Sequence, residues 1–214
     1  MKMWSGRFRQ GLDPEFERWQ RSFSFDRRLL KYELAASAAH ARALKNAGVL
    51  SADELITILE GLQGIGNPCA SANSGKNQQE IPPLVGESAS IRDDGGEVND
   101  DDGVEDVHHF VEKKLVARIG DLGYKLHSGR SRNEQIATDL RLFVCAAIDE
   151  LRSEIGELCA VFVDRAEQAG LAAMPAYTHL QHAEPVLAAH WLLAYVEMFL
   201  RDAGRLADCR QRVN

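Results

Sequence analysis

Cysteine is scarce in this sequence and follows no pattern of metal ligands. The 214 residues contain four cysteines, without a Cys-x-x-Cys pair or paired histidine ligands. This spacing argues against a zinc site and for reduced thiols. We expect three of the four to pack within helices. The four are Cys69, Cys145, Cys159 and Cys209.

Long apolar runs and an excess of basic charge are also missing. No apolar run approaches the roughly 20 residues that a membrane-spanning helix needs, and residues 1–7 lack the apolar core of a signal peptide. The formal net charge of -7 offers no basic excess that would attract nucleic acid. We therefore expect a cytoplasmic protein with neither a membrane nor a nucleic-acid partner.

Apolar residues recur every three or four positions over most of the chain, which predicts an all-α fold. Asp13 and Pro14 suit a helix start, as a capping side chain followed by proline. Gly48 suits a helix end, and Ser51 with Glu54 forms a capping signature. The predicted helices cover about 13–21, 26–47, 51–65, 104–119, 132–169 and 185–214, with a loop over 174–181.

Residues 66–103 interrupt this helical pattern. They are dense in glycine, serine, asparagine, aspartate and proline, and bury too little apolar surface to offset the entropy lost on ordering. We predict a disordered insert there. It lies within a small helical amino-terminal domain, 1–103, which precedes a partial helical-bundle domain, 104–214. The wide apolar stripes of the two long helices predict self-association.

The stretch before the longest helix carries groups that bind anions. Ser131 and Glu134 have the spacing of a capping box, so a helix is expected to begin near Arg132. Its first turn presents free backbone N–H groups, and Arg130 and Arg132 add guanidinium groups that bind carboxylates. Asn133 adds an amide. This pattern indicates recognition of a small polycarboxylate, while a solvated, capped helix start is an equally good interpretation of the spacing.

Five stretches, taken together, resemble one enzyme family. The Gly-Arg-Ser-Arg-Asn-x-Gln segment at 129–135, followed by Thr138-Asp139-Leu140-Arg141-Leu142, resembles the signature of argininosuccinate lyases, in the aspartase/fumarase superfamily. The other four occur in the family's order. They are Trp-Ser-Gly-Arg-Phe at 4–8, Ser-x-x-x-Asp at 22–26 with Ala-His-Ala at 39–41, Glu-Asp-Val-His at 105–108, and Met-Pro-x-Tyr-Thr-His-Leu-Gln-x-Ala-x-Pro at 174–185.

The resemblance implies a reaction and an assembly. The reaction is β-elimination of argininosuccinate to L-arginine and fumarate, a step of arginine biosynthesis, without a metal or organic cofactor. The implied fold places these helices at the start of the superfamily's central helical bundle. The implied assembly is a homotetramer in which each active site takes residues from three subunits.

The resemblance also implies roles for individual residues. His179 is the candidate catalytic base, acting directly or by polarising another base, and a hydrogen-bonded loop histidine is its structural alternative. Thr178 and Asn133 would bind the carboxylates of the succinyl part of the substrate. Helix capping is the alternative for Asp26 and Ser131. The substrate-binding candidates are Ser22, Asp26, His108, Ser131, Arg132, Asn133, Thr178 and Gln181.

One segment of the superfamily is not found in these residues. Its Gly-Ser-Ser-x-Met-Pro-x-Lys-x-Asn loop, which supplies a catalytic serine, has no match here. We therefore expect the isolated chain to be the amino-terminal half of such a lyase and to turn over little substrate. The alternatives are another fumarate-releasing lyase of the superfamily and a non-catalytic, crystallin-like helical protein that only assembles.

Overall fold

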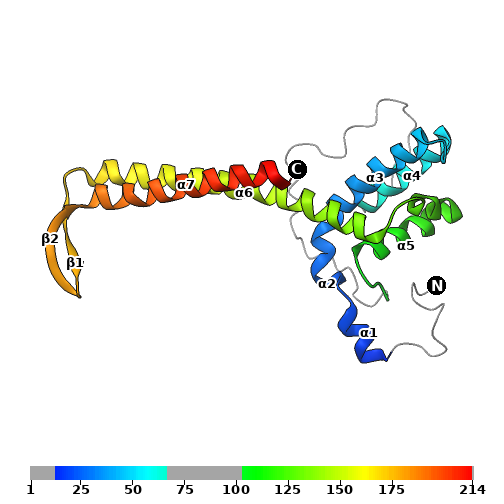
Figure 1. Cartoon of the computed structure of the whole chain (residues 1–214), viewed down its shortest axis with the longest axis horizontal. Coiled ribbons are helices and arrows are strands. Elements are labelled where there is room, and N and C mark those ends of the chain that lie inside the picture. Colours follow the sequence, from blue (N-terminus) through cyan, green and yellow to red (C-terminus); the bar gives the residue numbers. More distant parts are fainter. Residues whose placement is uncertain (1–12, 67–102, 214) are drawn as a thin grey trace. The chain divides into compact units, whose positions relative to one another are not determined.

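The computed structural model describes residues 13–66 and 103–213, and these form two compact units. We call residues 13–66 with 103–139 the head unit, and residues 140–213 the hairpin unit (Figure 1). The motif at 4–8 and nearly all of the insert predicted at 66–103 lie outside the described residues. The units divide after Asp139, and our domain boundary at 103 stays a prediction.

The head unit opens with short helical segments. Helix α1 (Pro14–Gln20) begins as expected, since the Asp13 carboxylate accepts hydrogen bonds from the backbone N–H groups of Glu15 and Phe16. The helices predicted at 13–21 and 26–47 leave a break at 22–25, and of these residues only Ser22 is non-helical. Phe23 begins helix α2 (Phe23–Asp26), followed by a 3-10 turn, η1 (Arg27–Leu29), and helix α3 (Leu30–Asn46). Gly48 adopts the left-handed φ of 77° that ends α3.

Three helices pack around the core of the head unit. Helix α4 (Ala52–Gly66) starts with the predicted capping box, in which Ser51 and Glu54 exchange hydrogen bonds of 2.9 and 3.1 Å. Helix α5 (Val107–Ile119) follows, capped by Asp106. The apolar faces of α3, α4 and α5 bury one cluster of side chains, which includes Leu34, Ala38, Ile58, Leu62, Val111 and Leu115. This core holds the start of α5 against α3, where the polar residues discussed below lie.

A 3-10 segment leads from α5 into the longest helix. Segment η3 (Gly120–His127) packs close to α5, because a Cβ on Gly123 would stand 3.1 Å from backbone atoms of Val116. Helix α6 (Arg132–Ala169) then runs for 38 residues, and its first turns belong to the head unit. Its predicted start near Arg132 and its end before Gly170, with φ of 50°, are both confirmed.

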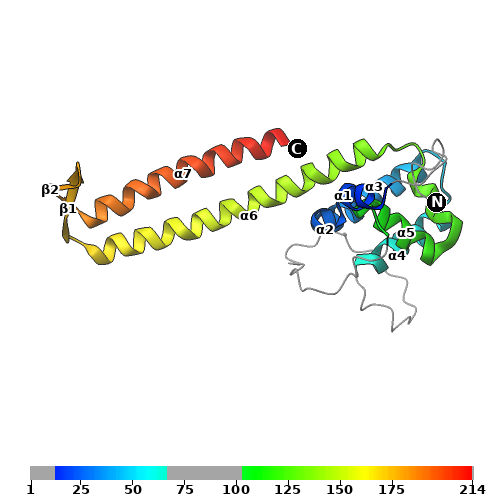
Figure 2. The same cartoon turned by 90° about the horizontal axis from the view of Figure 1, so that it is seen from below.

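The hairpin unit pairs two helices and a small sheet (Figures 1 and 2). The later part of α6 lies antiparallel to helix α7 (Ala188–Val213), with Phe162 stacked 6.0 Å from Phe199 and Arg210 3.1 Å from Asp149. Between them, strands β1 (Ala173–Thr178) and β2 (Gln181–Leu187) form an antiparallel pair. The loop predicted over 174–181 and the helix start predicted near Pro185 are therefore wrong.

The two prolines of the hairpin occupy paired positions of its strands. Pro175 and Pro185 are partners in the register, so the two residues without a backbone N–H face each other. The register is irregular between Pro175 and Tyr177. A two-stranded sheet between long helices leaves the fold all-α in class, as expected.

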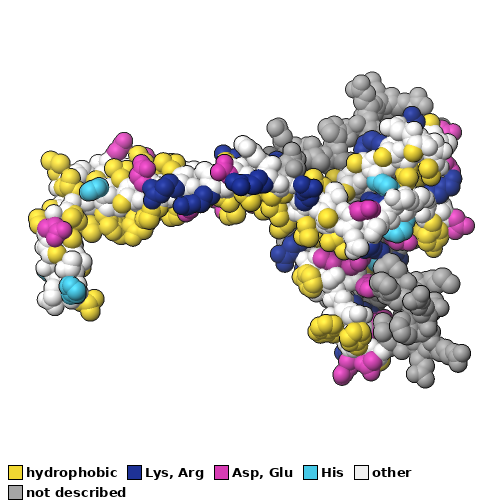
Figure 3. Space-filling view, in the orientation of Figure 1, with side chains coloured by type: hydrophobic (Ala, Val, Ile, Leu, Met, Phe, Trp, Pro, Cys, Tyr) yellow, Lys and Arg dark blue, Asp and Glu magenta, His cyan; other side chains and the backbone are white. Residues whose placement is uncertain are grey.

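Apolar side chains remain exposed along the hairpin unit. Figure 3 shows hydrophobic side chains over α6 and α7. Among the large ones at least 37% exposed are Leu140, Leu151, Val161, Trp191, Leu193, Tyr195 and Leu200. No helix among the described residues is both long and apolar enough to cross a membrane.

Candidate functional site

Ser22 and Asp26 tie the first helices of the head unit to the start of α5. The Ser22 hydroxyl donates a hydrogen bond of 2.6 Å to Asp26, and the other Asp26 oxygen accepts one of 3.1 Å from the Val107 backbone N–H. The Ser22 N–H also donates to the carbonyl of Glu105 at 2.9 Å. Burial raises the pKa of Asp26, against the opposing effect of the Ser22 hydrogen bond. These bonds place both predicted residues at one end of α5.

Arg132 joins the start of α6 to the same end of α5. Its guanidinium lies 3.0 Å from the Asp106 carboxylate and 3.9 Å from Glu112. Ser131 caps α6, which was the structural alternative given for it. Its hydroxyl accepts a hydrogen bond from the Asn133 N–H at 3.2 Å, and the Glu134 carboxylate accepts one from the Ser131 N–H at 2.8 Å. Asn133 is exposed on the first turn. The structure thus places five predicted residues on or next to α2 and at the starts of α5 and α6.

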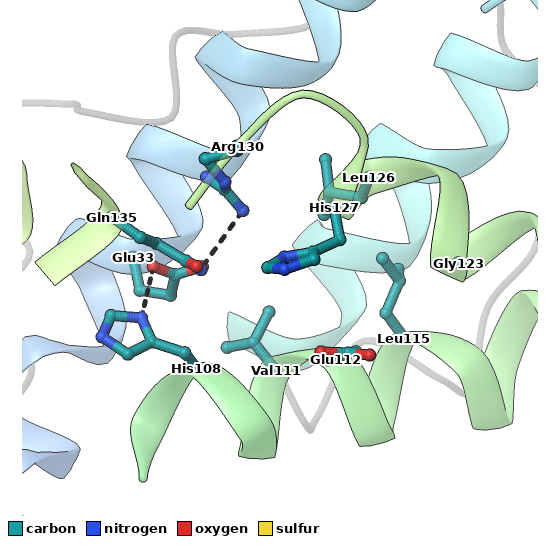
Figure 4. A pocket seen from close by; sticks show the side chains of 10 residues that line it. All are labelled: Glu33, His108, Val111, Glu112, Leu115, Gly123, Leu126, His127, Arg130 and Gln135. Carbon is teal, nitrogen blue, oxygen red and sulfur yellow. Dashed lines mark hydrogen bonds and ion pairs between the residues drawn. The ribbon is translucent and has the colours of Figure 1, made fainter. Parts of the chain in front are cut away.

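His108 lies in a buried polar cluster centred on Glu33 of α3 (Figure 4). One oxygen of the Glu33 carboxylate is within hydrogen-bonding distance of Nδ1 of His108, at 2.8 Å. Its other oxygen accepts from Ser37 at 2.6 Å and from Gln135 at 2.5 Å, and Arg130 stands 3.9 Å away. A buried carboxylate is stable only with such donors. The orientation of the His108 ring is therefore set by the Glu33 carboxylate, which contacts Nδ1.

Asp139 adds a second carboxyl group to this cluster without a donor of its own. It is fully buried, one of its oxygens is 3.6 Å from Nδ1 of His108, and neither oxygen accepts a hydrogen bond within the described part of the chain. Burial, then the negative charge of Glu33, raises the pKa of Asp139 far above the usual carboxyl range. Burial opposes ionisation of Glu33 too, but hydrogen bonds from His108, Asp139 and Ser37 outweigh it and lower the pKa of Glu33.

Glu33, His108 and Asp139 also have the residue types and proximity of a metal site. One ligand atom of each lies within 4.8 Å of the others. Two ligands of a tetrahedral zinc ion stand about 3.3 Å apart, from bond lengths of about 2.0–2.1 Å. Glu33 and His108 stand 2.8 Å apart in a hydrogen bond, so a zinc ion bound by both would displace that proton. The geometry fits a hydrogen-bonded cluster better than a metal centre.

A small cavity lies beside the cluster. It has a volume of about 20 Å³ and is lined by Glu33, His108, Arg130 and Gln135 together with polar and apolar residues of α5 and η3 (Figure 4). Such a volume holds about one water molecule. It is too small for an amino-acid substrate, so the cluster supports neighbouring groups instead of enclosing a ligand.

The remaining predicted residues lie on the hairpin. Thr178 ends β1, Gln181 begins β2, and His179 occupies the turn between them; all three are exposed. His179 and Leu180 adopt positive φ angles of 51° and 62°, which are unfavourable for residues with a Cβ atom. Within the described residues, the His179 side chain has no hydrogen bond or ion pair. It is thus presented at the tip of a tight turn.

A shallow apolar groove lies next to the hairpin. It measures about 430 Å³ and is lined by residues of β1, β2 and α7, among them Met174, Tyr177, His190 and Trp191. His182 belongs to β2, where its Nε2 lies 3.0 Å from the Tyr177 hydroxyl.

Sequence reasoning missed Glu33, Ser37 and the paired role of Asp139. Glu33 and Ser37 stand four residues apart on the same face of α3 as the buried Leu34, Ala38 and Ala41. Polar residues within an apolar stripe are the signal that could have revealed them. In the sequence, Asp139 stood out only as a member of the motif at 138–142.

Comparisons with known proteins agree with this architecture. The profile of a family described as "Lyase" matches residues 6–214. The chain is 56% identical over its whole length to an argininosuccinate lyase of Koribacter versatilis (strain Ellin345) and 54% identical to that of Acidobacterium capsulatum, covering 40% of each relative. These matches confirm the resemblance seen in the motifs, and the chain spans about two fifths of the length of these relatives.

Solved structures show the same fold at lower identity. A variant of EDDS lyase with bound fumarate matches with a TM-score of 0.64 and 22% identity, over 96% of this chain and 36% of its own. A protein described as fumarate lyase:delta crystallin from Brucella melitensis matches with a TM-score of 0.63 and 13% identity, over 86% of this chain and 41% of its own. At these identities the likeness concerns the fold alone.

Proposed function

We propose, from the premise that this chain belongs to the lyase family whose profile matches residues 6–214, that it contributes to the elimination of fumarate from argininosuccinate. The observation that supports this most is the identity of 56% with an argininosuccinate lyase along the entire chain. Because the chain covers 40% of that relative, the activity of a whole enzyme, its substrate and its assembly are part of the proposal.

The reaction makes three chemical demands. A base removes a proton from the carbon next to a carboxylate, and the electron pair moves into that carboxylate to give a dianion. Cations and hydrogen-bond donors stabilise the dianion. As the carbon–nitrogen bond breaks, the electron pair returns to form the double bond of fumarate, and an acid protonates the departing guanidino nitrogen. No oxidant or reductant is required.

The head unit supplies groups suited to the second demand. The side chain of Asn133 is exposed on the first turn of α6, next to Arg132, and the positive end of a helix dipole favours a carboxylate. Arg132 is held by Asp106 at 3.0 Å, so its guanidinium is already oriented. Ser22 and Asp26 hold the start of α5 in place through their hydrogen bonds to each other and to the Val107 N–H. In the proposal, Arg132 and Asn133 bind the succinyl carboxylates.

The hairpin unit supplies the candidate base. His179 is exposed, has no partner within the described residues, and follows Thr178, whose hydroxyl can donate to a carboxylate. Imidazole exchanges a proton near neutral pH. We propose that His179 of one copy serves head-unit residues of another. The apolar side chains exposed on α6 and α7 support such a homotetramer, since a free chain would leave them in water. Location in the cytoplasm is part of the same proposal.

A complementation assay tests the proposed role of His179. A full-length relative is first inactivated by replacing its own histidine at the matching position with alanine. The purified chain is then added, and fumarate release from argininosuccinate is followed by ultraviolet absorbance. We expect wild-type chain to restore turnover and the His179→Ala variant to restore at least about 100-fold less, which is the lower range for general acid–base catalysis. The His182→Ala variant, altered in the same hairpin, should restore it fully.

A second function, assembly without catalysis, is favoured by the exposed apolar residues of α6 and α7 alone. It makes a different prediction in the same assay. The chain would form mixed oligomers with the relative, seen as a shift in size-exclusion mass, yet no added chain would restore fumarate release. Rescue by His179→Ala as strong as by wild type would contradict the role of the histidine while leaving assembly intact.

A further inference from the structure

The buried acidic pair in the head unit has a role that the proposed chemistry does not use. Glu33 and Asp139 come from α3 and α6, and both contact the same ring nitrogen of His108, on α5. All three side chains are at most 4% exposed. Burying two carboxyl groups away from water costs free energy of folding unless hydrogen bonds or opposite charges compensate for it.

The hydrogen bonds are distributed unequally between the two carboxyl groups. Ser37 and Gln135 donate to Glu33 at 2.6 and 2.5 Å, and Nδ1 of His108 lies 2.8 Å from it. Asp139 receives no hydrogen bond from the described residues on either oxygen. Two neighbouring carboxylates in a low-dielectric site cannot both ionise without a large cost. The charge therefore resides on Glu33, and the proton on Asp139.

A neutral Asp139 is also consistent with its surroundings. As a carboxylic acid it can donate to Glu33, and this hydrogen bond is one of the causes that lower the pKa of Glu33. Arg130 stands 3.9 Å from Glu33 and bonds Ser37 at 3.2 Å, so the positive charge in the cluster also lies on the Glu33 side. The two acids have opposite protonation states because the hydrogen-bond donors of the cluster reach Glu33 and not Asp139.

We propose that Glu33 is a positioning residue that holds the proton of His108 on Nδ1, with Asp139 as its neutral partner, so that Nε2 of His108 is the ring nitrogen able to accept. An acceptor fixed at Nδ1 sets both the tautomer and the ring orientation of a histidine. The role of His108 in a lyase site rests on the proposed function. The placement of its proton does not, because it can be measured without turnover.

Nitrogen-detected NMR of the whole chain, labelled with ¹⁵N-histidine, tests the placement. The long-range ring correlations of His108 should show the proton on Nδ1, the nitrogen that lies 2.8 Å from Glu33. The Asp139→Asn variant replaces a neutral acid with a neutral amide of the same shape, so the His108 pattern should remain as in wild type. The Glu33→Gln variant removes the charge and should shift that pattern.

Controls make each outcome decisive. The Glu54→Gln variant alters an exposed carboxylate that pairs with Lys125 and should leave the His108 pattern unchanged. A proton on Nε2 in the wild type would overturn the proposal, as would an Asp139→Asn shift as large as that of Glu33→Gln. Zinc that displaces the Nδ1 proton at a stoichiometric amount would overturn it in favour of a metal site. If Glu33→Gln fails to fold, the wild-type and Asp139→Asn spectra still decide.

Discussion

The two units of the chain treat their polar residues in opposite ways. In the head unit, His108 is buried and its Nδ1 is bound by Glu33 at 2.8 Å, with Ser37 and Gln135 completing the cluster. In the hairpin unit, His179 is exposed on a turn with unfavourable φ and has no partner within the described residues. The buried histidine is held in place by its own chain. The exposed histidine is available to a ligand or to another chain.

This difference indicates where mutations should affect stability and where they should affect function alone. Disrupting the head cluster leaves buried groups unsatisfied, which costs free energy of folding. Altering the hairpin tip changes a solvated turn, with little effect on the core. The following predictions test this difference between the two units.

The largest effect is expected from Glu33→Ala. The change leaves Nδ1 of His108 and the Ser37 and Gln135 donors without their buried acceptor, and breaking a buried charged pair costs about 3–5 kcal/mol. The free energy of unfolding, from urea titration followed by circular dichroism, should fall by this amount. His179→Ala should change it by much less. Equal effects of the two variants would show that the contrast between the units is wrong.

A methyl group added to a glycine should have opposite effects in the two units. Gly123→Ala places its Cβ 3.1 Å from backbone atoms of Val116, which cannot move away easily, so we expect a loss of about 1–3 kcal/mol. Gly156→Ala lies within α6 with no atom within 4 Å of the new Cβ. It should gain about 0.5–1 kcal/mol from helix propensity. Thermal unfolding of both variants in parallel measures the difference.

The head cluster should also make stability depend on pH. Asp139 has a raised pKa in the folded chain, so the folded state binds more protons than the unfolded state between the usual carboxyl pKa and the raised value. Stability should therefore decrease as pH rises through that window, by at most about 1.4 kcal/mol per pH unit. Glu33, with a lowered pKa, acts oppositely, and its contribution is lost only as pH falls through about 2.

Asp139→Asn checks the sign of this dependence. The variant cannot titrate, so its free energy of unfolding should vary less between about pH 5 and pH 8 than that of wild type. Equal pH dependence of wild type and variant across this range would mean that Asp139 is already ionised in the folded chain. Urea titrations at a series of pH values supply the measurement.

The smallest effect is expected at the tip of the hairpin. Leu180 is 93% exposed with φ of 62°, so Leu180→Gly removes left-handed strain of about 1 kcal/mol without losing buried area. Slower hydrogen exchange of the β1 and β2 amides would report the stabilisation. Leu171→Gly is the matched control, because Leu171 is 87% exposed but has no positive φ, and it should not slow exchange.

The helices of this chain were largely predictable because their signals are local. The capping residues Asp13, Ser51 and Ser131 each bond within four residues, so spacing in the sequence suffices to place them. The hairpin was missed because its strands are short and contain Pro175 and Pro185, which usually indicate a loop. The two prolines, which have no backbone N–H to donate, are paired with each other across the two strands. This pairing cannot be seen from either strand alone.

The candidate site was predictable in its parts but not in its arrangement. The resemblance of short motifs to one enzyme family selected Ser22, Asp26, His108, Arg132 and His179 as candidates, and their roles stay predictions. The cluster around Glu33 joins residues 102 positions apart, as with Gln135, and no local pattern predicts such a contact. The protonation states in this cluster depend on contacts between side chains of α3, α5 and α6.

The sequence by itself determined the helical class of the chain, the helix ends at Gly48 and Gly170, and the family, because periodicity, left-handed glycines and motifs act over short stretches. The tertiary structure alone decided that Glu33 carries a charge while Asp139 does not. That outcome depends on which donors reach each carboxyl group after α3, α5 and α6 have packed. Burial then converts a difference of a few hydrogen bonds into opposite protonation states.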